Sequence, residues 1–230
     1  MENKTINIGV VEKVADALND LRDKVAFVGG AVISLYTDDP AADELRPTKD
    51  IDLSITLESY GAWAALQEEL ARLGFSPDPT SHVYCRFTYE DVTVDIMPDD
   101  EKVLGFSNPW YKPGLQNLMK YSLPNGMEIN LLPLPYFIAT KFSAFHGRGE
   151  SQHRTSHDFE DIIYLTDNCI SIVQVITSTE GEVKDYLQGE YKQVWENENR
   201  TEIISCHLSP IIREERLKII ESKIQQILGV

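Results

Sequence analysis

Two aspartates lie within a stretch that otherwise has the pattern of a buried strand. In "RPTKDIDLSIT" (residues 46–56) apolar residues occupy every second position, and Asp50 and Asp52 fall between them. Because side chains of a strand point alternately to its two faces, both carboxylates lie on the same face. Neighbouring carboxylates repel each other and raise each other's pKa unless a cation lies between them. The spacing therefore predicts a cation site.

A third aspartate, Asp95, lies in a second strand-like stretch, "VTVDIMP" (residues 92–98). If this strand lies beside the first, the three carboxylates converge on one face of a sheet. Mg²⁺ would remove their repulsion, since it prefers oxygen ligands and commonly binds through carboxylates and substrate phosphates; Mn²⁺ would serve in the same way. We expect Asp50, Asp52 and Asp95 to be metal ligands, although an aspartate at a strand start can also simply cap a turn.

Two glycines precede this acidic strand and suggest a phosphate site. Gly29 and Gly30 end the short apolar stretch "VAFVGG" and begin a predicted helix. Glycine lets the backbone approach a phosphate closely, and a helix N-terminus supplies N–H donors with a partial positive charge. A phosphate-binding turn followed by two acidic strands would rarely arise in this order by chance, and it favours the metal site over simple turn caps.

The stretch "KFSAFHGRGESQHRTSHDFEDI" (residues 141–162) is rich in cations and histidines. Lys141, on a predicted helix, could neutralise triphosphate charge. Asp158 and Asp161 share a helix face and could orient Lys141 or reach the nucleotide; equally, they could be acids favoured by the helix dipole. Arg148 lies in a glycine-containing loop and could close over the triphosphate.

A zinc site is an alternative for part of this stretch. His153 and His157 are four residues apart, and Asp161 continues the same face. The pattern lacks the glutamate of H-E-x-x-H and has no cysteine nearby, so it is a weak zinc motif.

The elements that must position these residues fall into two halves. Strands and helices alternate up to about residue 131, including a hairpin with a tight turn at Glu90-Asp91 and a helix capped by Ser59. From residue 132 onward the apolar pattern is helical. We expect an α+β fold, with an α/β core over residues 1–131 and a helical domain over 132–230 that contributes Lys141 and the Asp158/Asp161 motif.

Composition narrows the class of protein. The 230 residues carry a net charge of −16, which disfavours broad, nonspecific binding to nucleic acid. No apolar run approaches the roughly 20 residues that span a membrane, and no signal peptide precedes the first helix. The chain has three cysteines, which is an odd number, and they lie far apart in the sequence. A cytoplasmic protein without a membrane partner is the simplest expectation.

The motifs resemble the DNA polymerase β-like nucleotidyltransferase superfamily, and most closely its AbiEii-type bacterial branch, many of whose members are toxins. "VGG", "RPTKDIDL", "KFSAFHGR" and "HDFEDI" carry the resemblance. It implies a mixed sheet with flanking helices. It also implies that the glycine pair and Lys141 bind the nucleotide, that Asp50 and Asp52 bind metal, and that Asp158 belongs to the last motif. A third strand acid is less constant in this branch, so Asp95 would be a base or a third ligand.

The resemblance implies a metal-dependent enzyme that moves a nucleoside monophosphate from an NTP to an acceptor hydroxyl, in a toxin–antitoxin or phage-defence system. A tRNA end, a protein and a small molecule all remain possible acceptors, and a cognate antitoxin protein is a possible partner. The alternative is a nucleotide-binding or partner-binding protein on the same fold that has no catalytic activity.

Overall fold

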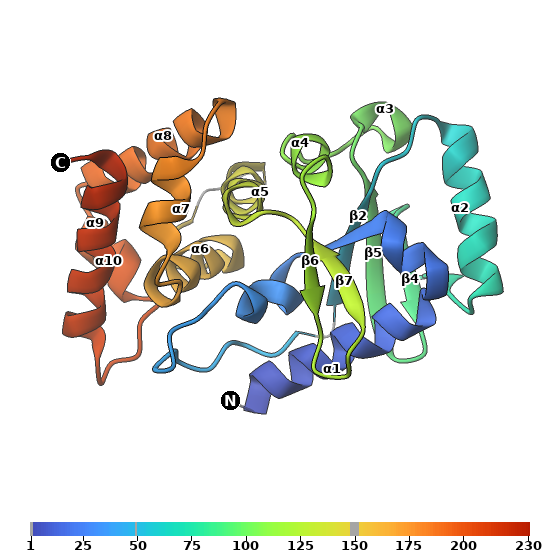
Figure 1. Cartoon of the computed structure of the whole chain (residues 1–230), viewed down its shortest axis with the longest axis horizontal. Helices are drawn as coiled ribbons and strands as arrows, with labels where there is room; N and C mark the ends of the chain where they lie inside the picture. Colours follow the sequence, from blue (N-terminus) through green and yellow to red (C-terminus); the bar gives the residue numbers. More distant parts are fainter. Residues whose placement is uncertain (1, 49, 148–151) are drawn as a thin grey trace. The chain divides into compact units, whose positions relative to one another are not determined.

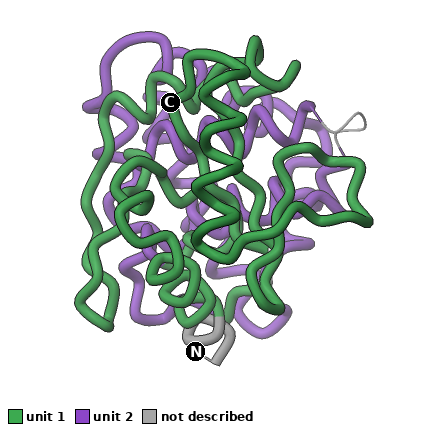
Figure 2. The backbone as a smooth tube through the Cα atoms, turned by 90° about the vertical axis from the view of Figure 1, so that its right-hand side faces the viewer, with its two compact units in different colours: residues 1–34, 44–133 green, residues 35–43, 134–230 purple. Residues whose placement is uncertain are grey.

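The computed structural model describes residues 2–48, 50–147 and 152–230 (Figure 1). The chain forms two compact units, coloured separately in Figure 2. The first comprises residues 1–34 and 44–133, and the second comprises residues 35–43 and 134–230. No helix in the described ranges is both long and apolar enough to cross a membrane.

The first unit is built on a mixed sheet, which has seven strands in the part of the chain that is described, in the order β3-β4-β5-β2-β1-β7-β6. The pairs β2–β5 and β1–β7 are parallel and the other pairs are antiparallel. The strands are β1 (Val25–Val28), β2 (Asp50–Ile55), β3 (Ser76–Pro77), β4 (Arg86–Tyr89), β5 (Val92–Pro98), β6 (Met119–Ser122) and β7 (Glu128–Leu131).

The central strands β1 and β2 carry the apolar core of this sheet. All four residues of β1 are buried, as expected for a strand covered on both faces. In β2 the apolar residues Ile51, Leu53 and Ile55 are buried, whereas Asp50 is exposed and Asp52 is partly exposed. The predicted alternation therefore holds at the end of β2 where the acidic side chains lie.

Helices precede and connect the strands of the first unit. Ser59 caps α2 by accepting a hydrogen bond from the backbone N–H of Ala62 at 3.2 Å, which confirms the predicted cap. The helix expected after Gly29 is a 3₁₀ helix of six residues. The helices are α1 (Glu2–Ala17), η1 (Asn19–Lys24), η2 (Gly30–Leu35), α2 (Tyr60–Arg72), α3 (Glu101–Leu104) and α4 (Tyr111–Leu115).

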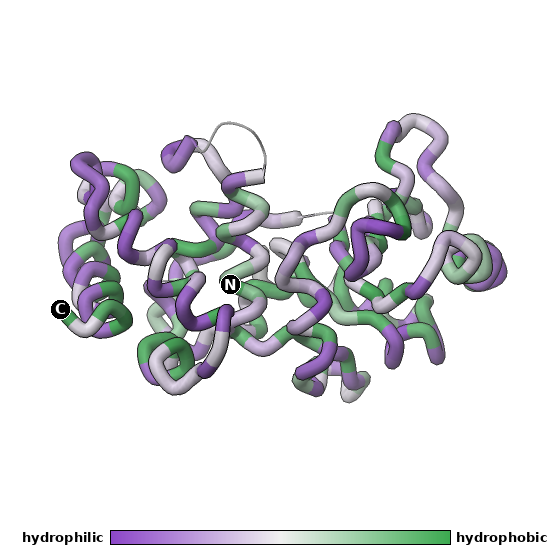
Figure 3. The backbone as a smooth tube through the Cα atoms, turned by 90° about the horizontal axis from the view of Figure 1, so that it is seen from above, coloured by the Kyte–Doolittle hydropathy of each residue, from purple (hydrophilic) through white to green (hydrophobic). Residues whose placement is uncertain are grey.

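The second unit is helical, so the predicted α+β architecture with a helical C-terminal half is confirmed. Its last helix packs against the four preceding ones, and the alternation of hydrophobic and hydrophilic residues near the C-terminus is visible in Figure 3. The helices are α5 (Leu134–Gly147), α6 (His157–Asn168), α7 (Ile172–Ser178), α8 (Glu182–Glu196), α9 (Arg200–Ser205) and α10 (Arg213–Leu228).

Candidate active site

The register of β2 and β5 brings two of the predicted acidic residues side by side. Asp52 pairs with Asp95 and Asp50 pairs with Thr93 across the parallel strands. Residues opposite each other in a ladder point to the same face, so Asp50, Asp52 and Asp95 share one face of the sheet. This arrangement is the one that the alternating pattern predicts for the three acids.

Asp95 is held by an arginine on the neighbouring strand. Arg86 on β4 pairs with Asp95 in register, and its guanidinium donates two hydrogen bonds to the carboxylate, from Nε to Oδ1 at 2.8 Å and from Nη2 to Oδ2 at 2.7 Å. Such two-point pairs are the strongest ionic hydrogen bonds in proteins. The bonds to Asp95 are the main reason why the pKa of Arg86 is raised.

Gly29 forms a turn against the carboxylate of Asp52. Its φ of +74° is in the left-handed region that favours glycine. A Cβ atom at Gly29 would lie 2.7 Å from the Cβ of Asp52 and 2.6 Å from its Cγ, closer than atoms can approach. Only glycine therefore allows the backbone turn and the Asp52 carboxylate to occupy neighbouring space, which joins the predicted phosphate turn to the acidic strand.

A second residue beside this turn is Arg46, whose guanidinium would lie 3.3 Å from a Cβ atom at Gly30. The chain between Arg46 and the acidic strand is held by Asn7 of α1, which is buried. The Asn7 side chain donates to the carbonyl of Arg46 at 3.2 Å and accepts from the backbone N–H of Thr48 at 3.0 Å. Asn7 thus fixes the entry into β2 just before Asp50.

The donors on β2 fit a magnesium ion that binds with a nucleotide. Asp50 and Asp52 supply carboxylate oxygens on one face, beside the glycine turn. Mg²⁺ in such sites usually takes one or two carboxylates and fills its shell with phosphate oxygens and waters. Within the described residues, no three His, Cys, Asp or Glu side chains are gathered as a complete metal site. Nucleotide oxygens would have to complete the coordination.

In the second unit, Lys141 on α5 is buried and pairs with two acids of α6, Asp158 and Asp161. Its Nζ donates to Oδ2 of Asp161 at 2.7 Å and lies 3.6 Å from Oδ1 of Asp158. All three side chains are less than 10% exposed. The two acids therefore fix the position of the Lys141 side chain.

Two further predictions concern Arg148 and the zinc alternative. Arg148 lies outside the described residues, so its predicted position is not tested. His157 begins α6 and its ring Nδ1 lies 3.0 Å from Glu160, whereas His153 precedes the helix and packs edge-on against the ring of Phe159. The two histidines therefore do not form the helical i, i+4 pair on which the zinc alternative depended.

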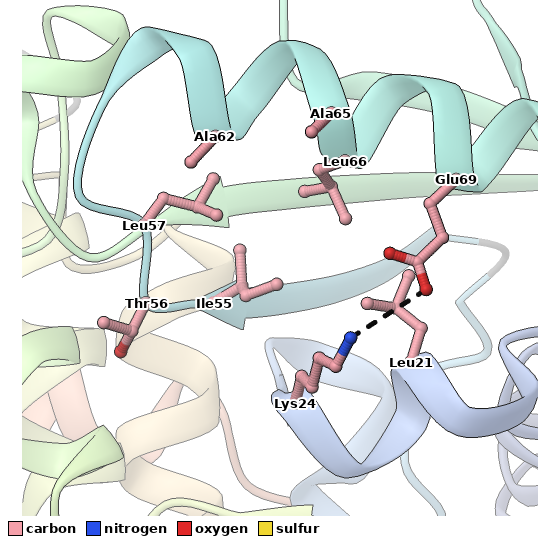
Figure 4. Close-up of a pocket in the computed structure, with 9 residues that line it drawn as sticks. All are labelled: Leu21, Lys24, Ile55, Thr56, Leu57, Ala62, Ala65, Leu66 and Glu69. Atoms are coloured by element: carbon pink, nitrogen blue, oxygen red, sulfur yellow. Dashed lines mark ion pairs between the residues drawn. The ribbon is translucent and has the colours of Figure 1, made fainter.

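A hollow of about 420 Å³ in the first unit lies apart from these residues (Figure 4). Leu21, Ile55 and Leu66 contribute to its apolar lining, and Lys24 and Glu69 face each other across it at 4.0 Å. It adjoins the C-terminal end of β2, whereas Asp50 and Asp52 are at the N-terminal end. The hollow is therefore not part of the candidate active site.

The fold and site together define a nucleotidyltransferase-like protein: a mixed sheet with a D-x-D strand beside a glycine turn, followed by a helical half. The chain belongs to the family described as nucleotidyl transferase AbiEii toxin of type IV toxin–antitoxin systems, whose model matches residues 14–227. This match confirms the resemblance of the motifs and supports nucleotidyl transfer in general terms. No curated protein sequence matches the chain.

Solved structures include similar folds. An antigenic nucleotidyltransferase-like protein from Paracoccidioides brasiliensis is 17% identical, with a TM-score of 0.53 over 93% of each chain. The antibiotic-resistance factor ANT(2'')-Ia is 13% identical, with a TM-score of 0.48 over 83% of this chain and 96% of its own. At such identities the first likeness supports the fold alone.

Sequence reasoning missed the role of Arg86, although the signal was present. The predicted two-residue turn at Glu90-Asp91 is observed, with Tyr89 opposite Val92. Counting back from that turn places Arg86 opposite Asp95. Asn7 had no such signal, because nothing in an amphipathic helix marks a buried asparagine as the residue that holds a distant loop.

Proposed function

We propose that the protein is a metal-dependent nucleotidyltransferase that transfers a nucleoside monophosphate from an NTP to an acceptor hydroxyl. The observation that carries the proposal is the contact between the Gly29 turn and the Asp52 carboxylate, on a strand that also bears Asp50. A phosphate-binding turn and a pair of metal-binding oxygens are useful together when the metal ion arrives with the triphosphate.

The residues have the following proposed roles. The backbone at Gly29 and Gly30 receives the phosphates, and Asp50 and Asp52 hold Mg²⁺ or Mn²⁺. The metal ion, when bound, would neutralise charge on the triphosphate and its leaving group. Lys141 supplies a fixed positive charge for the nucleotide, held by Asp158 and Asp161. Arg148 is a further proposed nucleotide-binding cation.

The reaction needs one bond to form and one to break. The acceptor oxygen attacks the α-phosphorus, the bond to the bridging oxygen of pyrophosphate breaks, and the acceptor proton passes to a base. Catalysis then depends mainly on positioning and on charge neutralisation. Asp95 is the proposed base or third ligand on this sheet face, and in either role it would compete with the two hydrogen bonds that it accepts from Arg86.

The proposed biological role rests on the family rather than on the site, and neither of them specifies the acceptor. Family membership supports a role as the toxin of a type IV toxin–antitoxin system, with a cognate antitoxin gene product as its counterpart. The net charge of −16 favours a compact acceptor contact over a broad nucleic-acid footprint. A tRNA end, a protein hydroxyl and a small molecule are the acceptor classes to compare.

The metal site can be tested by thermal unfolding with and without Mg²⁺ and a non-hydrolysable NTP analogue. A ligand that binds only the folded state raises its stability by mass action. We expect the combination to raise the melting temperature of the wild type, and to leave Asp50→Asn and Asp52→Asn folded but unresponsive. A full Mg²⁺-dependent rise in either variant would contradict the proposed ligands.

A further inference from the structure

The guanidinium of Arg86 already provides a positive charge at the third carboxylate of the site. Three side chains lie in register across adjacent strands: Asp52 on β2, Asp95 on β5 and Arg86 on β4. Arg86 binds both oxygens of Asp95, at 2.8 and 2.7 Å, and the Asp95 side chain is only 14% exposed. Each oxygen of Asp95 therefore already accepts a charged hydrogen bond, with which a metal ion would compete.

The influence of this arginine extends beyond Asp95. The charge of Asp50 also acts on the Arg86 guanidinium, so the arginine lies within the electrostatic field of the acids proposed to bind metal. A fixed cation at this position lowers the negative potential that attracts a divalent ion. It also makes a third carboxylate ligand costly, because the metal ion would have to displace a two-point ionic pair.

We propose that Arg86 is a positioning residue that keeps Asp95 from binding a divalent cation in the nucleotide-free protein. The inference rests on the proposed function, since it concerns the same acidic face. Asp50 and Asp52 alone then give a weak metal site, and the triphosphate must supply the missing oxygen ligands. As a consequence, the protein binds the metal ion tightly only when an NTP is bound as well.

The alternative is a purely structural role, in which the pair only fastens the open end of the β4–β5 hairpin. The two roles differ in what happens to metal binding. If Arg86 acts on the metal site, replacing it with glutamine frees both oxygens of Asp95 and strengthens metal binding. If it only fastens the hairpin, the replacement lowers stability and does not tighten metal binding.

The experiment is a Mn²⁺ titration of the nucleotide-free protein, followed by electron paramagnetic resonance, which detects free Mn²⁺ directly. Proteins compared are the wild type, Arg86→Gln, Arg86→Lys and the double variant Arg86→Gln/Asp95→Asn. Lys13→Gln is the matched charge control, because Lys13 pairs with Glu90 and Asp91 at the opposite end of the same hairpin. Melting temperatures are measured for every protein.

We expect Arg86→Gln to bind Mn²⁺ at least about tenfold more tightly than the wild type. Lys13→Gln should stay near wild-type affinity, and Arg86→Lys should fall between the wild type and Arg86→Gln, because lysine keeps the charge but cannot make the two-point pair. The double variant should lose the gain because it lacks the freed carboxylate. Equal or weaker binding by Arg86→Gln, or a gain that persists in the double variant, would overturn the inference.

The same titration, extended to Asp52→Asn, separates this inference from the proposed function. If Asp52→Asn weakens Mn²⁺ binding while Arg86→Gln leaves it unchanged, the metal site stands and the role of Arg86 falls. If neither the wild type nor any Arg86 variant binds Mn²⁺, even after a non-hydrolysable NTP analogue is added, both proposals fail.

Discussion

Gly29 and Asp52 constrain each other at the scale of single residues. The turn at Gly29 has a positive φ, and its missing side chain leaves space that Asp52 occupies. Other glycines in the first unit share the conformation without the contact: Gly105 and Gly126 have φ of +83° and +86°, and a Cβ there would meet nothing within 4 Å. A substitution at Gly105 or Gly126 therefore tests backbone strain alone, whereas a substitution at Gly29 tests strain together with displacement of the Asp52 carboxylate.

Alanine substitutions at these three glycines should therefore differ in activity more than in stability. Each should lose about 1–2 kcal/mol of unfolding free energy, because alanine is strained at positive φ, and Gly29→Ala should lose somewhat more, because its Cβ would overlap Asp52. Gly29→Ala must also move Asp52, and we expect at least about a 100-fold loss of transfer activity. Urea unfolding and a transfer assay check both effects. Equal activity in the three variants would show that the Gly29–Asp52 contact does not matter for catalysis.

At the scale of elements, the β4–β5 hairpin and helix α1 position the acidic face from two sides. The hairpin brings Arg86 to Asp95, and α1 brings Asn7 to the chain before β2. Because Asn7 is buried and bonds to both a carbonyl and an N–H, its loss would leave two backbone groups without these partners.

We expect Asn7→Ala to lower the unfolding free energy by about 1–3 kcal/mol. We also expect it to reduce transfer activity at temperatures where the protein stays folded, since the segment before Asp50 loses its anchor. Asn117→Ala is a suitable control, because Asn117 makes an exposed bond to the carbonyl of Pro113. Chemical unfolding and steady-state kinetics measure the two effects; a stable Asn7→Ala protein with full activity would refute the anchoring role.

Elements with a local signal were predictable, and those fixed by distant contacts were not. Alternation in β2, the cap at Ser59 and the turn at Glu90-Asp91 depend on neighbouring residues, so the sequence pattern sufficed. The helix expected after Gly29 is present as a 3₁₀ helix, and the sequence pattern did not indicate this type. The contact of Asn7 with residues 46–48 joins positions 39 and 41 residues apart, which no local pattern encodes.

At the scale of the whole molecule, residues 35–43 belong with the helical unit although they lie between β1 and β2 in the sequence. Asp38 accepts a bond from the backbone N–H of Ile170, and Asp39 pairs with Arg216 of α10. These partners are 132 and 177 positions away in sequence, so sequence patterns could not reveal the assignment. Arg216 also binds Asp167, near the end of α6.

Arg216 should be the most important charged residue of this unit for stability, and its effect should depend on pH. Burial raises the pKa of Asp167 above its usual range, and Arg216 opposes that shift. Without the arginine the folded-state pKa of Asp167 rises further. A raised folded-state pKa means that stability is greatest below the usual carboxyl range and is lost as pH rises through the folded-state pKa.

We therefore expect Arg216→Met to cost about 3 kcal/mol of unfolding free energy at pH 7, and distinctly less near pH 4, where Asp167 takes up a proton. Lys223, which donates to three carbonyls at the end of α6, should limit the loss. Arg154→Met removes an exposed pair with Glu202 and should change stability little. Urea unfolding at both pH values measures the loss of unfolding free energy. An equal loss at pH 7 and pH 4 for Arg216→Met would contradict this account of Asp167.

The measurement that tests the central claim most directly follows the two ends of the triphosphate. The protein is incubated with Mg²⁺, a cell extract and each NTP, labelled with ³²P at either the α- or the γ-phosphorus. Relative to the same extract without the protein, nucleotidyl transfer predicts that additional α-label enters an acceptor, that additional γ-label appears in pyrophosphate and not in the acceptor, and that Asp52→Asn abolishes both changes. Additional transfer of γ-label to the acceptor, or additional α-labelling that persists with Asp52→Asn, would contradict the account.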